Sequence, residues 1–188
     1  MPQPVIRIKA IYHRNNPILI NQAPQWWGAP THGISQRSGL LWDQLEAGGI
    51  AGITGIYFHT AYLIAISMKQ MYPGHAKQVG NAAISLIGGA RNGRYVVVVD
   101  EDIDPSNLWD VTWAMASRCD PDEDIDIIRK AWSGALDPRK KKGDNFNSRA
   151  IVTATRPYDW KDQFPPVAES SPELAAKTKA KWSHLLKK

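Results

Sequence analysis

A run of four valines, Val96–Val99, constrains the fold of this chain more than any other feature. Successive side chains of a strand point to opposite faces, so an unbroken β-branched run favours a strand that is buried on both sides. Such a strand needs helices over each face of its sheet. We therefore expect an α/β fold, a layered domain with a mixed, mostly buried sheet flanked by helices.

The hydrophobic periodicity of the rest of the chain predicts alternating strands and helices. Strands are expected at residues 5–12, 51–58, 63–67, 95–99 and 149–154. Helices are expected at residues 35–47, 75–88, 105–117 and 124–132, and again after Ser171. We divide the chain into a domain at residues 1–168 and a C-terminal docking helix within 169–188.

The stretch from Ala47 to Met68 contains no charged residue and is long enough to cross a bilayer. It also holds four glycines, which weaken a helix, and several isoleucines and aromatic residues, which favour strands. We therefore expect two buried strands with a bend near residues 59–61. A membrane span is the weaker alternative.

The 188 residues suffice for one domain with its own core. The single cysteine, Cys119, cannot form an internal disulfide, so we expect a cytoplasmic protein. Eight tryptophans are many for this length, and large aromatic rings are often used in pockets or interfaces.

The formal net charge is +5, yet the only dense basic run is Arg139–Lys142. A glycine and polar residues follow it, which is typical of an exposed loop. A solvated loop is favoured over a patch that binds phosphate or RNA, and no nucleic-acid partner is expected.

The valine run ends in an acidic string that contains Asp100, Asp102 and Asp104. A calcium loop is excluded because Pro105 occupies the position of the required glycine. Carboxylates at the end of a buried strand could bind a metal or act as acid and base, as in a metal-dependent hydrolase. A structural acidic cluster is favoured, with Asp104 capping the next helix and the others facing cations such as Arg118. The histidines show no metal-ligand spacing, so no metal site is expected.

Four segments carry a family resemblance: residues 8–19, 67–83, 96–128 and 150–155. The third is the most specific, with an apolar strand, the acidic string, and then Trp113, Ala114, Arg118 and Pro121 at fixed spacing. The chain resembles the C-terminal part of UbiD-type decarboxylases, which use prenylated FMN. One departure is Thr153, where the family often has aspartate.

The resemblance implies a subunit or C-terminal portion of an enzyme that reversibly (de)carboxylates an aromatic or α,β-unsaturated acid. The family's flavin domain and catalytic residues precede the matching region. Prenylated FMN, its divalent metal and its K⁺ would therefore be bound mainly by a larger UbiD-like catalytic subunit or a missing domain. This chain would close the active site and build a homo- or hetero-oligomer, and would be inactive alone. A non-catalytic structural or regulatory subunit is the alternative.

Several site residues follow from the same resemblance. Lys69 matches a lysine that approaches the flavin phosphate. A small aromatic acid would contact a substrate pocket formed by Tyr57, His59, Thr60, Tyr62, Trp132 and Leu136. The apolar stripe of the last helix contains Leu174, Trp182 and Leu185. By its pattern the stripe could pack on its own domain or on a partner, and the resemblance favours a neighbouring protomer.

Overall fold

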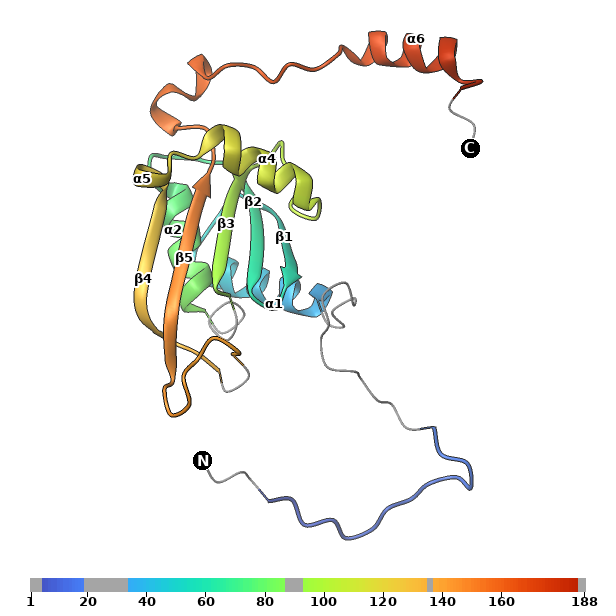
Figure 1. The fold of residues 1–188 in the computed structure, drawn as a ribbon, viewed down its shortest axis with the longest axis vertical. Coiled ribbons are helices and arrows are strands. Elements are labelled where there is room, and N and C mark those ends of the chain that lie inside the picture. The colour runs from blue at the N-terminus through green and yellow to red at the C-terminus, as the bar shows by residue number, and fades with distance from the viewer. Residues whose placement is uncertain (1–4, 19–33, 87–92, 135–136, 186–188) are drawn as a thin grey trace. The chain divides into compact units, whose positions relative to one another are not determined.

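A computed structural model describes residues 5–18, 34–86, 93–134 and 137–185 (Figure 1). The chain forms two units, Met1–His32 and Gly33–Lys188. The strands of the second unit are β1 (Ile53–Thr60), β2 (Leu63–Met68), β3 (Tyr95–Asp100), β4 (Ile125–Trp132) and β5 (Phe146–Ala154). Its helices are α1 (Ile34–Ala47), α2 (His75–Ser85), α4 (Leu108–Arg118), α5 (Pro121–Asp124), the 3₁₀ helix η1 (Tyr158–Gln163) and α6 (Pro172–Trp182).

The five strands form one mixed sheet in the order β1-β2-β3-β5-β4. The three central strands, β2, β3 and β5, run parallel, and the two edge strands, β1 and β4, run antiparallel to their neighbours. The valine run lies in β3 at the centre of this sheet, with its four side chains buried. The predicted α/β fold with a mixed, mostly buried sheet is confirmed.

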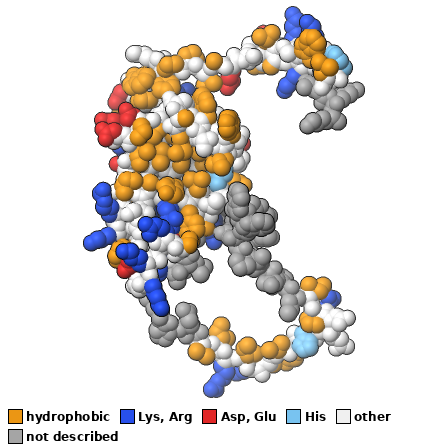
Figure 2. Space-filling view, in the orientation of Figure 1, with side chains coloured by type: hydrophobic (Ala, Val, Ile, Leu, Met, Phe, Trp, Pro, Cys, Tyr) orange, Lys and Arg blue, Asp and Glu red, His pale blue; other side chains and the backbone are white. Residues whose placement is uncertain are grey.

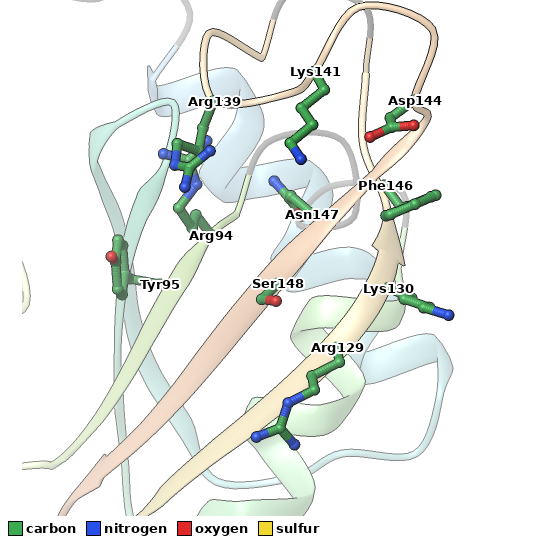
Figure 3. Close-up of a pocket in the computed structure, with 10 residues that line it drawn as sticks. All are labelled: Arg94, Tyr95, Arg129, Lys130, Arg139, Lys141, Asp144, Phe146, Asn147 and Ser148. Atoms are coloured by element: carbon green, nitrogen blue, oxygen red, sulfur yellow. The ribbon is translucent and has the colours of Figure 1, made fainter.

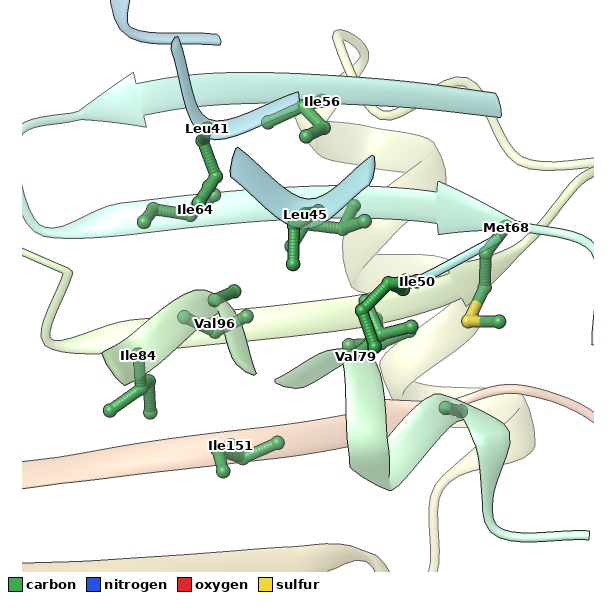
Figure 4. Packing of buried hydrophobic residues seen from close by; sticks show 14 of the residues in the cluster. Leu41, Leu45, Ile50, Ile56, Ile64, Met68, Val79, Ile84, Val96 and Ile151 are labelled. Atoms are coloured by element: carbon green, nitrogen blue, oxygen red, sulfur yellow. The ribbon is translucent and has the colours of Figure 1, made fainter. Parts of the chain in front are cut away.

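Helices cover both faces of the sheet. On one face, α1 and α2 contribute Leu41, Leu45 and Val79 to a core that includes Val96 and Val98 (Figure 4). On the other face, Val111 and Ala114 of α4 pack against Val97, Val99 and Val152. The alternating valines of β3 therefore supply both cores, because successive side chains of a strand point to opposite faces.

The uncharged stretch from Ala47 to Met68 forms the end of α1 and the antiparallel pair β1 and β2. The two predicted strands are confirmed, but in β1 only Ile56 and Phe58 are buried. Gly52, at φ +78°, allows the chain to enter β1, because a Cβ there would lie 2.6 Å from the Lys69 carbonyl oxygen. None of the helices in the described ranges is long and apolar enough to span a membrane.

Two predicted elements are wrong. Residues 5–12 are exposed and form no strand, because nothing in the described part of the chain pairs with them. Residues 125–132 form strand β4 rather than a helix, and only Pro121–Asp124 is helical. The β-branched Ile125 and Ile127 pair with Val152 and Ala150 on the free edge of β5. That pairing outweighs local helix propensity.

The helix after the acidic string begins later than predicted. Asn107, not Asp104, is the N-cap of α4, and its side chain accepts a hydrogen bond from the Trp109 backbone. The predicted helix at residues 75–88 ends at Ser85, and residues 87–88 lie outside the described ranges. Helix α6 has no buried residue and ends at Trp182, so Leu185 of the predicted stripe lies beyond it. Leu174, Trp182 and Leu185 are all exposed. The division at residue 168 stays a prediction.

Candidate functional site

Asp100, at the carboxyl end of β3, is fully buried and surrounded by donors. Its Oδ2 accepts from Arg118 Nη1 at 3.0 Å, from the Arg156 backbone nitrogen at 2.8 Å and from Arg156 Nε at 3.1 Å. Its Oδ1 accepts from Gln70 Nε2 at 3.0 Å. A buried carboxylate is stable only when it is paired and hydrogen-bonded in this way. Asp100 therefore joins the ends of three parallel strands to α4.

Arg118 lies between two carboxylates. Besides Asp100, its guanidinium contacts both oxygens of Asp102, at 2.7 and 2.8 Å, in a fork that fits a carboxylate. These bonds lower the pKa of Asp102 against the opposing effect of partial burial. The guanidinium also lies over the Trp113 ring at 5.2 Å from its centroid. The ion pair between Arg118 and Asp102 fixes the last turn of α4 against the loop that follows β3.

Asp104 stands apart from this network and makes a local turn. Its Oδ1 accepts from the backbone nitrogen and hydroxyl of Ser106, at 2.8 and 2.7 Å. His59 of β1 contacts the same loop through Nε2, which lies 2.9 Å from the Pro105 carbonyl oxygen. Burial lowers the pKa of His59 although that hydrogen bond and Asp104 act in the opposite direction.

Metal chemistry does not fit the acidic cluster. In the described residues no three His, Cys, Asp or Glu side chains are placed to hold a metal ion. The oxygens of Asp100 are already occupied by Gln70, Arg118 and Arg156. A bound cation would have to displace these donors, two of which are positively charged.

Lys69, the predicted flavin contact, lies at the opposite end of the strands from three residues of the predicted pocket, Thr60, Tyr62 and Trp132. Lys69 is exposed at the carboxyl end of β2. Thr60 and Tyr62 lie beside the start of β2, six residues away along an extended strand, which is roughly 20 Å. Trp132 lies at the same edge as Tyr62, paired with Phe146 at the start of β5. In the described part of the chain, Lys69 therefore does not share one site with Thr60, Tyr62 and Trp132.

The individual pocket residues make other contacts. Tyr57 and His59 meet edge to face with ring centroids 4.9 Å apart. Tyr62 carries the Arg94 guanidinium over its ring at 4.9 Å. Trp132 is 56% exposed. Leu136 lies outside the described residues.

The sequence reasoning missed two partners of Asp100. Gln70 follows β2 and Arg156 follows β5, and both strands run parallel to β3. Because the carboxyl ends of neighbouring parallel strands meet at one edge, this placement could have identified them once the pairing was known.

A second polar network, which the sequence did not predict, surrounds the buried Asp137 near the amino-terminal ends of β3 and β5. Its carboxylate accepts from Ser133 Oγ at 2.6 Å, from the Arg139 backbone nitrogen at 2.9 Å, and from the side chains of Arg94 and Asn147. Burial favours the neutral acid, yet these hydrogen bonds and the charge of Arg94 lower the pKa of Asp137 to about 2. Asp137 thus fixes the basic loop to β3 and β5.

Comparison with known proteins identifies the domain. Residues 34–154 match the family model of the 3-octaprenyl-4-hydroxybenzoate carboxy-lyase (UbiD) C-terminal domain. A phenolic acid decarboxylase of Bacillus subtilis is 34% identical over 162 residues, which cover 82% of this chain and 33% of that protein. One from Sedimentibacter hydroxybenzoicus is 33% identical over 159 residues, with 81% and 32% covered. The chain spans about a third of the length of these relatives.

Solved structures agree with the fold. The closed form of Sedimentibacter hydroxybenzoicus vanillic acid decarboxylase (ShVdcCD) superposes with a TM-score of 0.64 at 29% identity, covering 80% of this chain and 32% of that one. The UbiD-class enzyme HmfF from Pelotomaculum thermopropionicum, solved with FMN, gives a TM-score of 0.64 at 24% identity, covering 74% and 32%. The second likeness concerns the fold alone.

Proposed function

The chain belongs to the UbiD family, because residues 34–154 match the C-terminal domain of that family. We propose that it is one part of a two-component decarboxylase whose catalytic half is supplied by a larger chain. The reaction would be the reversible decarboxylation of an aromatic or α,β-unsaturated carboxylic acid. The phenolic acid decarboxylases among its relatives support this substrate class.

The two-component proposal rests on the hydrogen bonds of the polar residues at the carboxyl ends of the parallel strands. Arg118 pairs with both Asp100 and Asp102, and among the described residues no three His, Cys, Asp or Glu side chains are placed to hold a metal ion. Acid and base groups, the flavin, its divalent metal and its K⁺ would then come from the larger chain. The vanillic acid decarboxylase ShVdcCD contains a further component named ShVdcD, so a UbiD-class enzyme with more than one kind of chain has precedent.

The proposed contribution of this chain is to cover the active site of its partner and exclude water from it. Hydrophobic side chains gather over the sheet face beside α4 (Figure 2). The exposed hydrophobic side chains of these elements include Trp109 and Trp113 of α4, 79% and 39% exposed, and the half-exposed Tyr95 and Ile127 of the sheet. Exposed apolar surface of this kind is typical of a protein–protein contact. The single cysteine agrees with a reducing compartment, and we place the complex in the cytoplasm.

A second candidate is a structural or regulatory subunit that never contacts the reactants. The separation of Lys69 from Thr60, Tyr62 and Trp132 favours it, because these residues form no single pocket within the chain. An independent metal-dependent hydrolase finds no support in the geometry of Asp100, Asp102 and Asp104.

The test uses the full chain alone and together with the larger UbiD-like chain from the same organism, purified with its flavin. We expect the chain alone to lack flavin absorbance and to leave a phenolic acid unchanged, and the mixture to release CO₂. Decarboxylation by the chain alone would refute the proposal. A mixture that is no faster than the larger chain alone would favour the structural subunit.

A further inference from the structure

The basic run at residues 139–142 is largely exposed, as predicted for a solvated loop, and it also borders a cavity. Together with the amino-terminal ends of β3 and β5 and the end of β4, it encloses a partly open cavity of about 600 Å³ (Figure 3). Five basic side chains line this cavity and one acidic side chain, Asp144, faces them; the basic ones are Arg94, Arg129, Lys130, Arg139 and Lys141. The volume lies within the range of roughly 300–1,000 Å³ found for small-molecule sites.

Most of this positive charge is uncompensated. Arg94 pairs with Asp137, but Arg129, Lys130, Arg139 and Lys141 form no ion pair with any described residue. Figure 3 shows the Lys141 side chain reaching down from the loop toward Asn147, between Arg139 and Asp144. A hollow lined by one sign of charge concentrates the field and attracts anions.

A bulge in β4 adds two of these cations. Ile128 pairs with Arg149 and Ala131 pairs with Asn147, so Arg129 and Lys130 together oppose only Ser148. Adjacent residues of a regular strand point to opposite faces, whereas at this bulge both line the cavity. Lys130 adopts a left-handed backbone, φ 56°, which a residue with a side chain rarely does. Such backbone strain is concentrated at ligand sites.

Two residues that line the cavity also have buried polar atoms that lack a hydrogen-bond partner among the described residues. Arg94 Nε is an unpaired donor and Asn147 Oδ1 an unpaired acceptor. Buried polar groups are almost always hydrogen-bonded, directly or through water.

We propose that this cavity binds a small organic phosphate, with its phosphate group between Arg139 and Lys141. Guanidinium and ammonium groups bind phosphate oxygens strongly. Phe146 and Tyr95, each about half exposed, supply apolar surface for the organic part. The inference does not depend on the decarboxylase proposal, because it concerns residues of this chain alone.

The test is calorimetric titration of the full chain with adenosine monophosphate, inorganic phosphate and adenosine. We expect adenosine monophosphate to bind, phosphate to compete with it, and adenosine not to bind. Lys141→Ala and Arg139→Ala should each weaken binding about tenfold, the usual effect of removing one charged contact. Lys142→Ala removes the same charge from the same loop but from outside the cavity lining, and should change the affinity less than twofold.

Three results would overturn the proposal: no binding of adenosine monophosphate at millimolar concentration, adenosine binding as tightly as its phosphate, or equal losses in Lys142→Ala and Lys141→Ala. Lys141, Arg139 and Lys142 are exposed, so these variants should fold normally, which circular dichroism would verify. Arg94 is unsuitable as a test residue, because it holds the buried Asp137.

Discussion

Arg118 Nη1 lies 3.0 Å from Asp100 Oδ2, and both side chains are almost completely buried. The contact joins the last turn of α4 to the carboxyl end of β3, eighteen residues earlier in the chain. An acidic string that could have been catalytic is thereby used to hold a helix on the sheet.

Asp100→Asn should strongly destabilise the domain. The substitution leaves Arg118 buried beside a neutral amide and removes an acceptor that serves several donors, which costs about 3–5 kcal/mol. Urea unfolding would measure the loss. Asp102→Asn is the matched control: its side chain is 38% exposed, so the cost should be about 1 kcal/mol. Equal losses would mean that burial of Asp100 does not matter.

Asp137 should make stability depend on pH at the acid end. The pKa of its carboxyl is about 2 in the folded chain and near 3.8 unfolded, so its contribution is complete above about pH 4 and disappears as the pH falls toward 2. The shift corresponds to about 2 kcal/mol. In Asp137→Asn, stability at pH 7 should fall and the slope between pH 4 and 2 should flatten. Asp162→Asn, at an exposed position, should leave the slope unchanged.

Two glycine-to-alanine substitutions in helices should have opposite effects. A Cβ at Gly80 of α2 would lie 2.3 Å from Ile151 Cγ2, so Gly80→Ala should destabilise by about 1–3 kcal/mol. Gly39 of α1 has open space, so Gly39→Ala should stabilise by up to about 1 kcal/mol through helix propensity. The cost of Gly80→Ala should shrink in an Ile151→Ala background; an unchanged cost would locate the clash elsewhere.

Lys69→Ala tests the flavin contact that the family resemblance implies. In the complex with the larger chain, loss of this ammonium should weaken flavin binding about tenfold, the effect of one charged hydrogen bond. Fluorescence titration of the flavin would measure it. Lys142→Ala, at the opposite edge of the sheet, serves as the control. Unchanged flavin affinity in Lys69→Ala would support the structural subunit instead.

Removal of residues 169–188 should separate folding from assembly. Helix α6 has no buried residue, so the melting temperature of the rest should change little. If the stripe of Leu174, Trp182 and Leu185 docks on another chain, the truncated protein and Trp182→Asp should both lose their partner in sedimentation experiments. Lys179→Ala, at another exposed position on the helix, should retain it. Assembly that survives truncation would exclude α6 as the interface.

The local sequence was sufficient to predict a helix or strand wherever the hydrophobic pattern alone selects that element. The valine run determined a central strand with helices on both sides, and glycines with β-branched residues turned the uncharged stretch into β1 and β2. Residues 125–132 could not be predicted in this way, because they form a strand only where the edge of β5 is free to pair. Residues 5–12 show the converse, since an alternating pattern forms no strand without a partner.

The chemistry of the polar residues was decided only by the tertiary structure. Composition and spacing placed Asp100 at the end of a buried strand but could not show that Gln70, Arg118 and Arg156 would occupy its oxygens. In the same way, the basic run was predicted to be a solvated loop, and only the fold shows that Lys141 lines one cavity together with Arg129 of the distant strand β4. Periodicity is a local property of the chain, whereas the partners of a charge depend on which strands become neighbours.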